Sequence, residues 1–189
     1  MSSGKIIIFS APSGAGKTTI VRHLLGKDER LTFSVSATTR QPRPNEVDGK
    51  DYYFLSVSDF ENKIKNEEFA EYEQVYEGLF YGTLKAEIER IWSLGKHVVL
   101  DVDVKGGISI KKIYKEKALA IFVMPPSVDC LLERLIGRNT ETEESIKMRT
   151  EKAEYELSFE NEFDVSVIND KLEKACAESE NLINTFIGQ

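Results

Sequence analysis

The chain carries, near its start, a run of residues whose types and spacing suit the binding of phosphate. Residues 11–18 read APSGAGKT, small residues that end in a lysine and a threonine. The run follows an apolar stretch at 6–9 that predicts a short buried strand, and it precedes residues 19–25, which have helical periodicity. Strand, glycine-rich turn and helix form the context in which backbone N–H groups wrap a polyphosphate. We therefore predict a nucleotide-binding loop, the alternative being a flexible surface turn.

Within this loop, the residue types predict which groups meet the phosphates. Lys17 is placed to reach the outer phosphates, and the Thr18 hydroxyl is placed to ligate Mg²⁺. Ala11 replaces the first glycine of the G-x-x-x-x-G-K-[ST] pattern, which costs little if its φ is negative. The residues expected to contact the polyphosphate are Ser13, Gly14, Ala15, Gly16, Lys17, Thr18 and Thr19.

Two carboxylates stand at the end of a second apolar run. Residues 97–104 read HVVLDVDV, which predicts a buried strand with Asp101 and Asp103 on the same face. In a chain with a phosphate loop, a carboxylate that ends such a strand holds Mg²⁺, usually through water. The alternative is that the carboxylate caps a helix beginning near Gly106. We expect Asp101 to lie on the metal side, and the role of Asp103 stays open.

Two groups of arginines suggest a second phosphate-bearing ligand. Arg40 and Arg43 flank Pro42, which stiffens their loop, and arginine forks match phosphate oxygens in pairs. Tyr52 and Tyr81 could add hydroxyl donors. The second basic set consists of Arg134, Arg138 and Arg149. Salt bridges to nearby glutamates are the alternative for each arginine, but two groups and one phosphate loop favour two phosphate-bearing ligands.

The loop, the carboxylates and the arginines can act together only if the fold brings them to one edge of a sheet. Strand and helix signals alternate, which favours an α/β fold with a parallel sheet flanked by helices. Strands are expected at 6–9, 33–35, 52–55, 69–76, 97–104, 119–123 and 165–168. Helices are expected at 19–25, at 83–94, from 127, from 140 to about 160 and after 170. Ligands bind where parallel strands end, so the loop, the carboxylates and Asn169 should gather there.

The stretch 33–83 is poor in helix and differs from its flanks, so we interpret it as a small lobe inserted into the sheet. Pairs with the spacing of a capping box predict where three helices begin. These pairs are Ser58 with Glu61, Thr140 with Glu143, and Asp170 with Glu173.

Composition narrows the class of protein. The chain has 189 residues and a net charge of −7, which does not suit a sequence-independent nucleic-acid binder. Its apolar runs fall short of the ~20 residues that a membrane helix needs, and no signal peptide is expected. The two cysteines, Cys130 and Cys176, lack metal-ligand spacing and are expected to be reduced thiols in a cytoplasmic protein.

The chain resembles the guanylate kinases, which are P-loop nucleoside monophosphate kinases. The motifs that carry the resemblance are APSGAGKTT, SVSATTRQPRPNEVDGKDYYF, EFAEYEQVYEGLFYGT, DVDVKGG, PPS and GRNTETEESIKMR, in the family's order and spacing. The resemblance spans essentially the whole chain. It implies transfer of the γ-phosphoryl group from ATP to GMP, with Mg²⁺, in a single domain. That domain has a core (1–32, 84–136 and 150–189), a GMP-binding lobe (33–83) and a helical lid (137–149).

The resemblance also implies roles for individual residues. Those that match the guanine-reading positions are Ser36, Glu71 and Thr83, and those that match the GMP-phosphate positions are Arg40, Arg43, Tyr52 and Tyr81. Asp101 and Asp103 match a strand-end pair counted with the GMP site, and Asp101 joins Thr18 at the metal. The catalytic set implied is Lys17, Arg43, Arg134, Arg138 and Arg149; Arg134 and Arg138 also face ATP, and Asn169 lines the adenine site.

Two other functions compete with this one. Guanylate kinase-like domains also serve as non-catalytic protein-binding scaffolds, but those typically lack a working phosphate loop and part of the GMP set. A related P-loop kinase with another phosphorylated acceptor is disfavoured by Glu71, since a sugar phosphate needs no base-reading carboxylate. One further departure from the family is Lys105, which stands where glutamine is common. The sequence leaves the oligomeric state open.

Overall fold

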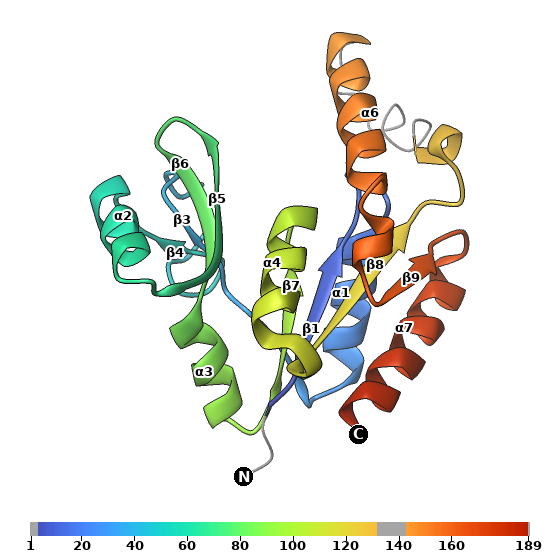
Figure 1. Cartoon of the computed structure of the whole chain (residues 1–189), viewed down its shortest axis with the longest axis horizontal. Coiled ribbons are helices and arrows are strands. Elements are labelled where there is room, and N and C mark those ends of the chain that lie inside the picture. Colours follow the sequence, from blue (N-terminus) through green and yellow to red (C-terminus); the bar gives the residue numbers. More distant parts are fainter. Residues whose placement is uncertain (1–3, 132–142, 189) are drawn as a thin grey trace.

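A computed structural model describes residues 4–131 and 143–188, and its centre is a five-stranded parallel sheet (Figure 1). The strand order is β2-β7-β1-β8-β9. The strands are β1 (Ile6–Ser10), β2 (Leu31–Phe33), β7 (His97–Asp101), β8 (Ala118–Met124) and β9 (Val165–Ile168), all paired in parallel. The predicted α/β fold with a parallel sheet is thus confirmed.

Helices cover both faces of this sheet because its central strand is apolar on both sides. One cluster joins strand residues to α1 (Lys17–Lys27) and α7 (Leu172–Ile187), and it includes Ile7, Phe9, Leu24 and Ile183. The other joins α3 (Lys85–Ser93) and α4 (Val104–Tyr114) to the opposite face, and it includes Ile6, Ile8, Ile88 and Ile110. Successive residues of β1 therefore serve opposite cores, as strand alternation requires.

A second, four-stranded sheet lies apart from the first (Figure 1, left). Its order is β4-β3-β6-β5, with β3 (Ala37–Thr38), β4 (Tyr53–Phe54), β5 (Phe69–Tyr76) and β6 (Leu79–Leu84). Helix α2 (Val57–Lys65) covers it through Phe60, whose ring stacks on Phe69 at 4.3 Å and on Phe80 at 5.1 Å. The chain enters this sheet after β2 and leaves it where β6 runs into α3.

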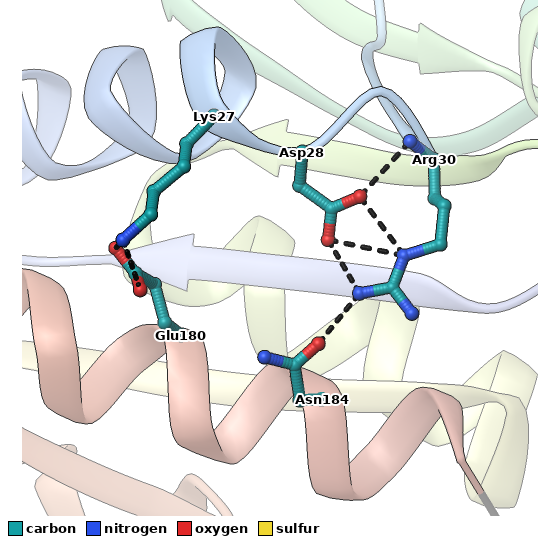
Figure 2. Close-up of polar contacts among 5 residues, drawn as sticks. All are labelled: Lys27, Asp28, Arg30, Glu180 and Asn184. Atoms are coloured by element: carbon teal, nitrogen blue, oxygen red, sulfur yellow. Dashed lines mark hydrogen bonds and ion pairs between the residues drawn. The ribbon is translucent and has the colours of Figure 1, made fainter.

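The remaining described elements connect strands of the five-stranded sheet. Helix α6 (Glu143–Leu157) precedes β9, and short 3₁₀ turns lie at η1 (Lys115–Lys117) and η2 (Glu160–Glu162). Figure 2 shows how α7 is tied to the end of α1 and to the turn that follows it: Lys27 Nζ pairs with Glu180 at 2.7 Å, and Arg30 donates to Asn184 at 2.5 Å. Within the described ranges, no helix combines the length and apolarity that a bilayer span requires.

Several predicted boundaries are wrong for identifiable reasons. The strand predicted at 97–104 ends at Asp101, because Asp103 caps α4 by accepting from Gly106 N at 2.6 Å. The helix predicted at 83–94 begins at Lys85, because Thr83 and Leu84 still pair with β5. The strand predicted at 33–35 lies instead at Leu31–Phe33, in register with β7.

Two predicted caps are also wrong. Helix α2 is capped by Ser56, which accepts from Asp59 N at 3.0 Å, rather than by Ser58. Helix α7 begins after Lys171 with no side-chain cap, so Asp170 does not play that part. The third predicted cap, Thr140, lies outside the described residues.

Candidate active site

The phosphate loop, residues 11–16, has the backbone that its glycines predict. Gly14 and Gly16 have φ values of 94° and 91°, in the left-handed region that favours glycine. A Cβ at Gly16 would also collide with the Asn169 amide, which donates to Ala15 O at 2.7 Å. Among the described non-glycine residues, only Glu67 and Lys115 have positive φ, so Ala11 fits its position without strain. The loop therefore tolerates the departure from the motif.

Lys17 and Thr18 meet Asp101 at the first turn of α1. Lys17 Nζ lies 2.5 Å from Asp101 Oδ1 and donates to Val102 O at 3.0 Å. Thr18 Oγ1 donates to the other oxygen, Oδ2, at 3.2 Å. The register of β1 with β7 places Phe9 beside Asp101, which brings the loop and this carboxylate to the same edge. The residues predicted for the metal, Thr18 and Asp101, thus lie together.

A cavity of about 460 Å³ opens over the loop. Its walls include Ser13, Gly14, Gly16, Lys17, Thr18, Thr19, Asp101 and Glu156. Backbone N–H groups at a helix N-terminus together with an ammonium group make a site for phosphate. We call this space the phosphate cavity.

Glu156, from α6, is a wall residue that the sequence analysis missed. It is only 8% exposed, and within the described part of the chain its Oε2 has no hydrogen-bond partner. Burial raises the pKa of this carboxyl, opposed by Lys152 and a backbone hydrogen bond from Ser13. A protonated Glu156 would remove one negative charge from a cavity built for phosphates.

A second cavity, of about 220 Å³, lies between the two sheets. Its lining comprises Ser36, Tyr52, Glu71, Glu73, Tyr81, Gly82, Asp101, Val102 and Asp103. Six of the nine residues predicted for the GMP site therefore line one space: Ser36, Tyr52, Glu71, Tyr81, Asp101 and Asp103. Thr83 is outside this lining and donates a hydrogen bond to Glu71. We call this space the acceptor cavity.

Glu71, like Glu73 of the same cavity, is a carboxylate whose pKa is raised to about 7. Burial raises its pKa to about 7, opposed by the hydrogen bond from Thr83 and reinforced by the charge of Asp103. Thr83 Oγ1 donates to Glu71 Oε1 at 2.7 Å, so this hydroxyl orients the carboxylate. A Cβ at Gly106 would approach Glu71 Oε2 to 2.9 Å, so a side chain at this position of α4 would displace the carboxylate.

Tyr52 and Tyr81 face each other on the side of the cavity nearest the arginine loop, with ring centroids 6.1 Å apart. Arg40 lies over Tyr52 at 4.8 Å and pairs through both terminal nitrogens with Glu46, each at 2.6 Å. That pairing lowers the pKa of Glu46 to about 2. Glu46 was missed by the sequence analysis, although it follows Arg43 by three residues, and it also accepts from Arg43 N at 2.8 Å.

The remaining predicted site residues either lie outside the two cavities, make other contacts or are not described by the structure. The Arg43 side chain is exposed and is not part of either cavity lining. Arg134 and Arg138 lie outside the described residues, and of Arg149 only its place in α6 is described. Asn169 contacts the phosphate loop through its hydrogen bond to Ala15 O. Asp103 caps α4 with one carboxylate oxygen, which accepts from Gly106 N, and its side chain shares a hydrogen bond with Glu73.

Comparisons with known proteins agree with this geometry. The family model described as guanylate kinase matches residues 3–186. A guanylate kinase of Bacteroides fragilis is 54% identical over 97% of this chain and 90% of its own length. One from Chlorobium chlorochromatii is 47% identical over 98% of this chain and 97% of its own length.

A solved structure supports the same assignment. The crystal structure of guanylate kinase from Anaplasma phagocytophilum superposes with a TM-score of 0.74 at 30% identity, covering 98% of this chain and 87% of that one. Fold, family match and relatives do not favour a scaffold or a kinase with another acceptor. The chain belongs to the guanylate kinase family and is an ATP:GMP phosphotransferase.

Proposed function

We propose that ATP binds in the phosphate cavity and GMP in the acceptor cavity, so that the γ-phosphoryl group crosses at the end of β7. One observation supports this most directly: both cavities are lined by Asp101, Val102 and Asp103. A transfer between two nucleotides needs their reacting phosphates in line and close together. Two adjoining cavities that share one strand end meet that need.

In this proposal, Glu71 reads the guanine base. Guanine presents N1–H and the 2-amino group side by side, two donors that an ionised carboxylate accepts together. Adenine has a lone pair at N1 and no 2-amino group, so it leaves the carboxylate unpaired. Ser36 donates to O6, while Thr83 holds Glu71 in place through their 2.7 Å hydrogen bond. The GMP phosphate is held by Tyr52, Tyr81, Arg40 and Arg43.

Lys17 serves the donor side. Its ammonium group leaves Asp101 and moves to the outer phosphates of ATP, where it balances charge that develops during transfer. Arg134, Arg138 and Arg149 are proposed to do the same from the lid, and Asn169 lies beside the adenine site. No covalent enzyme intermediate is needed: an oxygen of the GMP phosphate attacks the γ-phosphorus in line, the bond from that phosphorus to the β,γ-bridging oxygen breaks, and GDP and ADP result. Alignment and charge supply the catalysis.

The described residues fit Mg²⁺ as the accompanying cation. Asp101 and Thr18 present two oxygens within hydrogen-bond distance of each other, and Asp101 already faces a cation. No cluster of three acidic, histidine or cysteine side chains able to hold a metal occurs in the part of the chain that the structure describes. Mg²⁺ matches such a site, because it takes one or two protein oxygens and completes its shell with phosphates and water. When bound, it neutralises phosphate charge during transfer.

We further propose that the core (1–32, 84–136 and 150–189), the GMP lobe (33–83) and the lid (137–149) move relative to one another. Water would compete with GMP as acceptor, so closure is useful only when both nucleotides are present. Small-angle scattering should show compaction with GMP plus a non-hydrolysable ATP analogue. An unchanged radius of gyration would refute closure. A cytoplasmic location is proposed from the substrates and the two thiols.

The assignment of the acceptor cavity has its own test. Steady-state kinetics of Ser36→Ala and Glu71→Gln should show a higher KM for GMP and an unchanged KM for ATP. The glutamine of Glu71→Gln must turn a donor toward the base, so the ratio of kcat/KM for GMP to kcat/KM for AMP should also be smaller in this variant. An unchanged ratio of kcat/KM for GMP and AMP in Glu71→Gln would remove Glu71 from base reading.

A further inference from the structure

One charged side chain outside both cavities is almost completely buried. Glu87, on α3, is 3% exposed. Its carboxylate accepts four hydrogen bonds: from Val35 N at 3.2 Å, from Tyr53 Oη at 2.9 Å, and from Arg90 Nε and Nη2 at 2.7 and 2.8 Å. Burial opposes ionisation, but the donors from Arg90, Tyr53 and Val35 outweigh it and hold the pKa of Glu87 below its ordinary value. The buried charge is therefore compensated on both oxygens.

Glu87 stands where the chain passes between the two sheets. The first crossing, 34–36, links β2 to β3, and the second is the direct join of β6 to α3. Helix α3 belongs to the five-stranded sheet, because its fully buried Ile88 and Ile91 pack in the same cluster as Ile6 and Val98. Val35 lies in the first crossing, and Tyr53 belongs to β4 of the four-stranded sheet. The carboxylate thus joins one sheet to the other.

Both partners on the far side of Glu87 are direct chain neighbours of acceptor-cavity residues. Val35 precedes Ser36, and Tyr53 follows Tyr52, while Ser36 and Tyr52 line the cavity. Tyr53 N also donates to Ser36 O at 2.9 Å, which ties the two segments together. Adjacent side chains of an extended segment point to opposite sides, so a Tyr53 held on Glu87 directs Tyr52 the other way. The carboxylate therefore contacts both segments that carry Ser36 and Tyr52 into the cavity wall.

We propose that Glu87 is a positioning residue for the acceptor nucleotide, fixing the segments 35–36 and 52–53 against α3 and thereby placing Ser36 and Tyr52. The inference rests on the proposed binding of GMP by these two residues. Glu87 touches no nucleotide, and it acts through the Val35 N–H and the Tyr53 hydroxyl. Its loss should misplace the acceptor and leave the phosphate cavity as it is.

The test compares steady-state kinetics of Glu87→Ala, Glu87→Gln and Tyr53→Phe with those of Glu89→Ala, an exposed glutamate on the same helix. Glu87→Ala should raise the KM for GMP by about tenfold or more, the scale on which small misplacements of binding groups act. The KM for ATP should change by less than about twofold, because the phosphate loop is untouched. Tyr53→Phe, which removes one hydrogen bond, should raise the KM for GMP by about threefold to tenfold.

Glutamine offers rescue by a conservative variant. Its amide oxygen can accept from Val35 N and Arg90 Nη2, and its NH₂ group can donate to the Tyr53 oxygen but also faces the Arg90 Nε donor, so Glu87→Gln should recover part of the affinity for GMP that Glu87→Ala loses. Equal rises in both KM values, or a lower melting temperature with unchanged KM values, would overturn the inference and leave Glu87 structural. Should Glu87→Ala fail to fold, Tyr53→Phe and Glu87→Gln decide by the same criteria.

If GMP does not bind in the acceptor cavity, a different variant shows it. Ser36→Ala removes a proposed GMP contact without touching Glu87. An unchanged KM for GMP in Ser36→Ala would refute the placement of GMP, and with it the inference. A raised value in Ser36→Ala with an unaffected Glu87→Ala would refute only the positioning role.

Discussion

Glu71→Gln should make the protein more stable at pH 8 while making it a poorer enzyme. Burial between β5 and α4 raises the pKa of Glu71 to about 7 from the ordinary 4.5. The fold therefore favours the protonated form. The stabilisation from Glu71 is fully present below pH 4.5, and it is lost as pH rises through 7. Above that pH, the protein carries a buried carboxylate whose ionisation costs free energy of folding.

The magnitude follows from the two pKa values. At 1.36 kcal/mol for each pKa unit, the difference between 7 and 4.5 amounts to about 3 kcal/mol. Glutamine has nearly the same shape, keeps an acceptor for Thr83 and does not ionise. The variant should therefore exceed the parent in unfolding free energy by up to about 3 kcal/mol at pH 8 and by only about 0.8 kcal/mol at pH 5, where the unfolded carboxyl is already partly ionised.

Urea unfolding at pH 5 and pH 8 measures this difference. Glu89→Gln is the matched control, because it makes the same chemical change at an exposed position of α3 and should alter stability at neither pH. A stability difference that is equal at both pH values would refute the reasoning. So would a Glu71→Gln variant that is less stable than the parent at pH 8.

Three further changes test other parts of the site. Lys17→Ala should lower turnover by at least ~10²-fold in an assay of ADP formation, the scale of one preorganised charge contact, and near-normal activity would contradict the phosphate-loop assignment. Gly16→Ala should lose at least about 2 kcal/mol of stability, since it forces a side chain into positive φ and against Asn169. Gly26→Ala, which meets no atom within 4 Å inside α1, should gain about 0.5–1 kcal/mol, and equal effects of the two substitutions in urea would refute the argument. Finally, kcat/KM for GMP should fall about tenfold per pH unit below 7 as Glu71 takes up a proton. Glu71→Gln should show a shallower profile, since only the GMP phosphate and Glu73, whose pKa is also raised to about 7, then titrate in the acceptor site; an equally steep profile would exclude Glu71 as the cause.

Local patterns predicted the catalytic edge of the sheet well. The loop, its helix and Asp101 follow from strand, turn and helix signals that lie close together in the chain, and parallel strands bring their ends to one edge. The strand predicted at 69–76 is found at Phe69–Tyr76, because alternation in a hairpin is a strong signal. Boundaries failed where a tertiary contact outweighed the local signal, as with Leu84, which stays paired with Phe69 instead of starting α3.

Contacts between distant segments could not be predicted in this way. Glu46 is recognisable only once the loop folds back on Arg40, and Glu156 approaches Ser13 from a helix more than a hundred residues later. Glu87 carries no sequence signal at all, since a glutamate in the first turn of a helix is ordinary and its burial depends on Val35 and Tyr53. Asp103 illustrates a choice that sequence left open, because the same carboxylate suited a strand end or a helix cap.

The identity of the acceptor nucleotide is tested most directly by measuring ADP formation from ATP and Mg²⁺ by the purified chain with GMP, AMP, UMP or no acceptor. A site that pairs Glu71 with the two donors of guanine should prefer GMP over AMP by roughly 10⁴-fold in kcat/KM. ADP formation without an acceptor should be close to background, because water is excluded from the closed site. Comparable rates with GMP and AMP, or ADP formation that does not depend on an added acceptor, would contradict the proposed site.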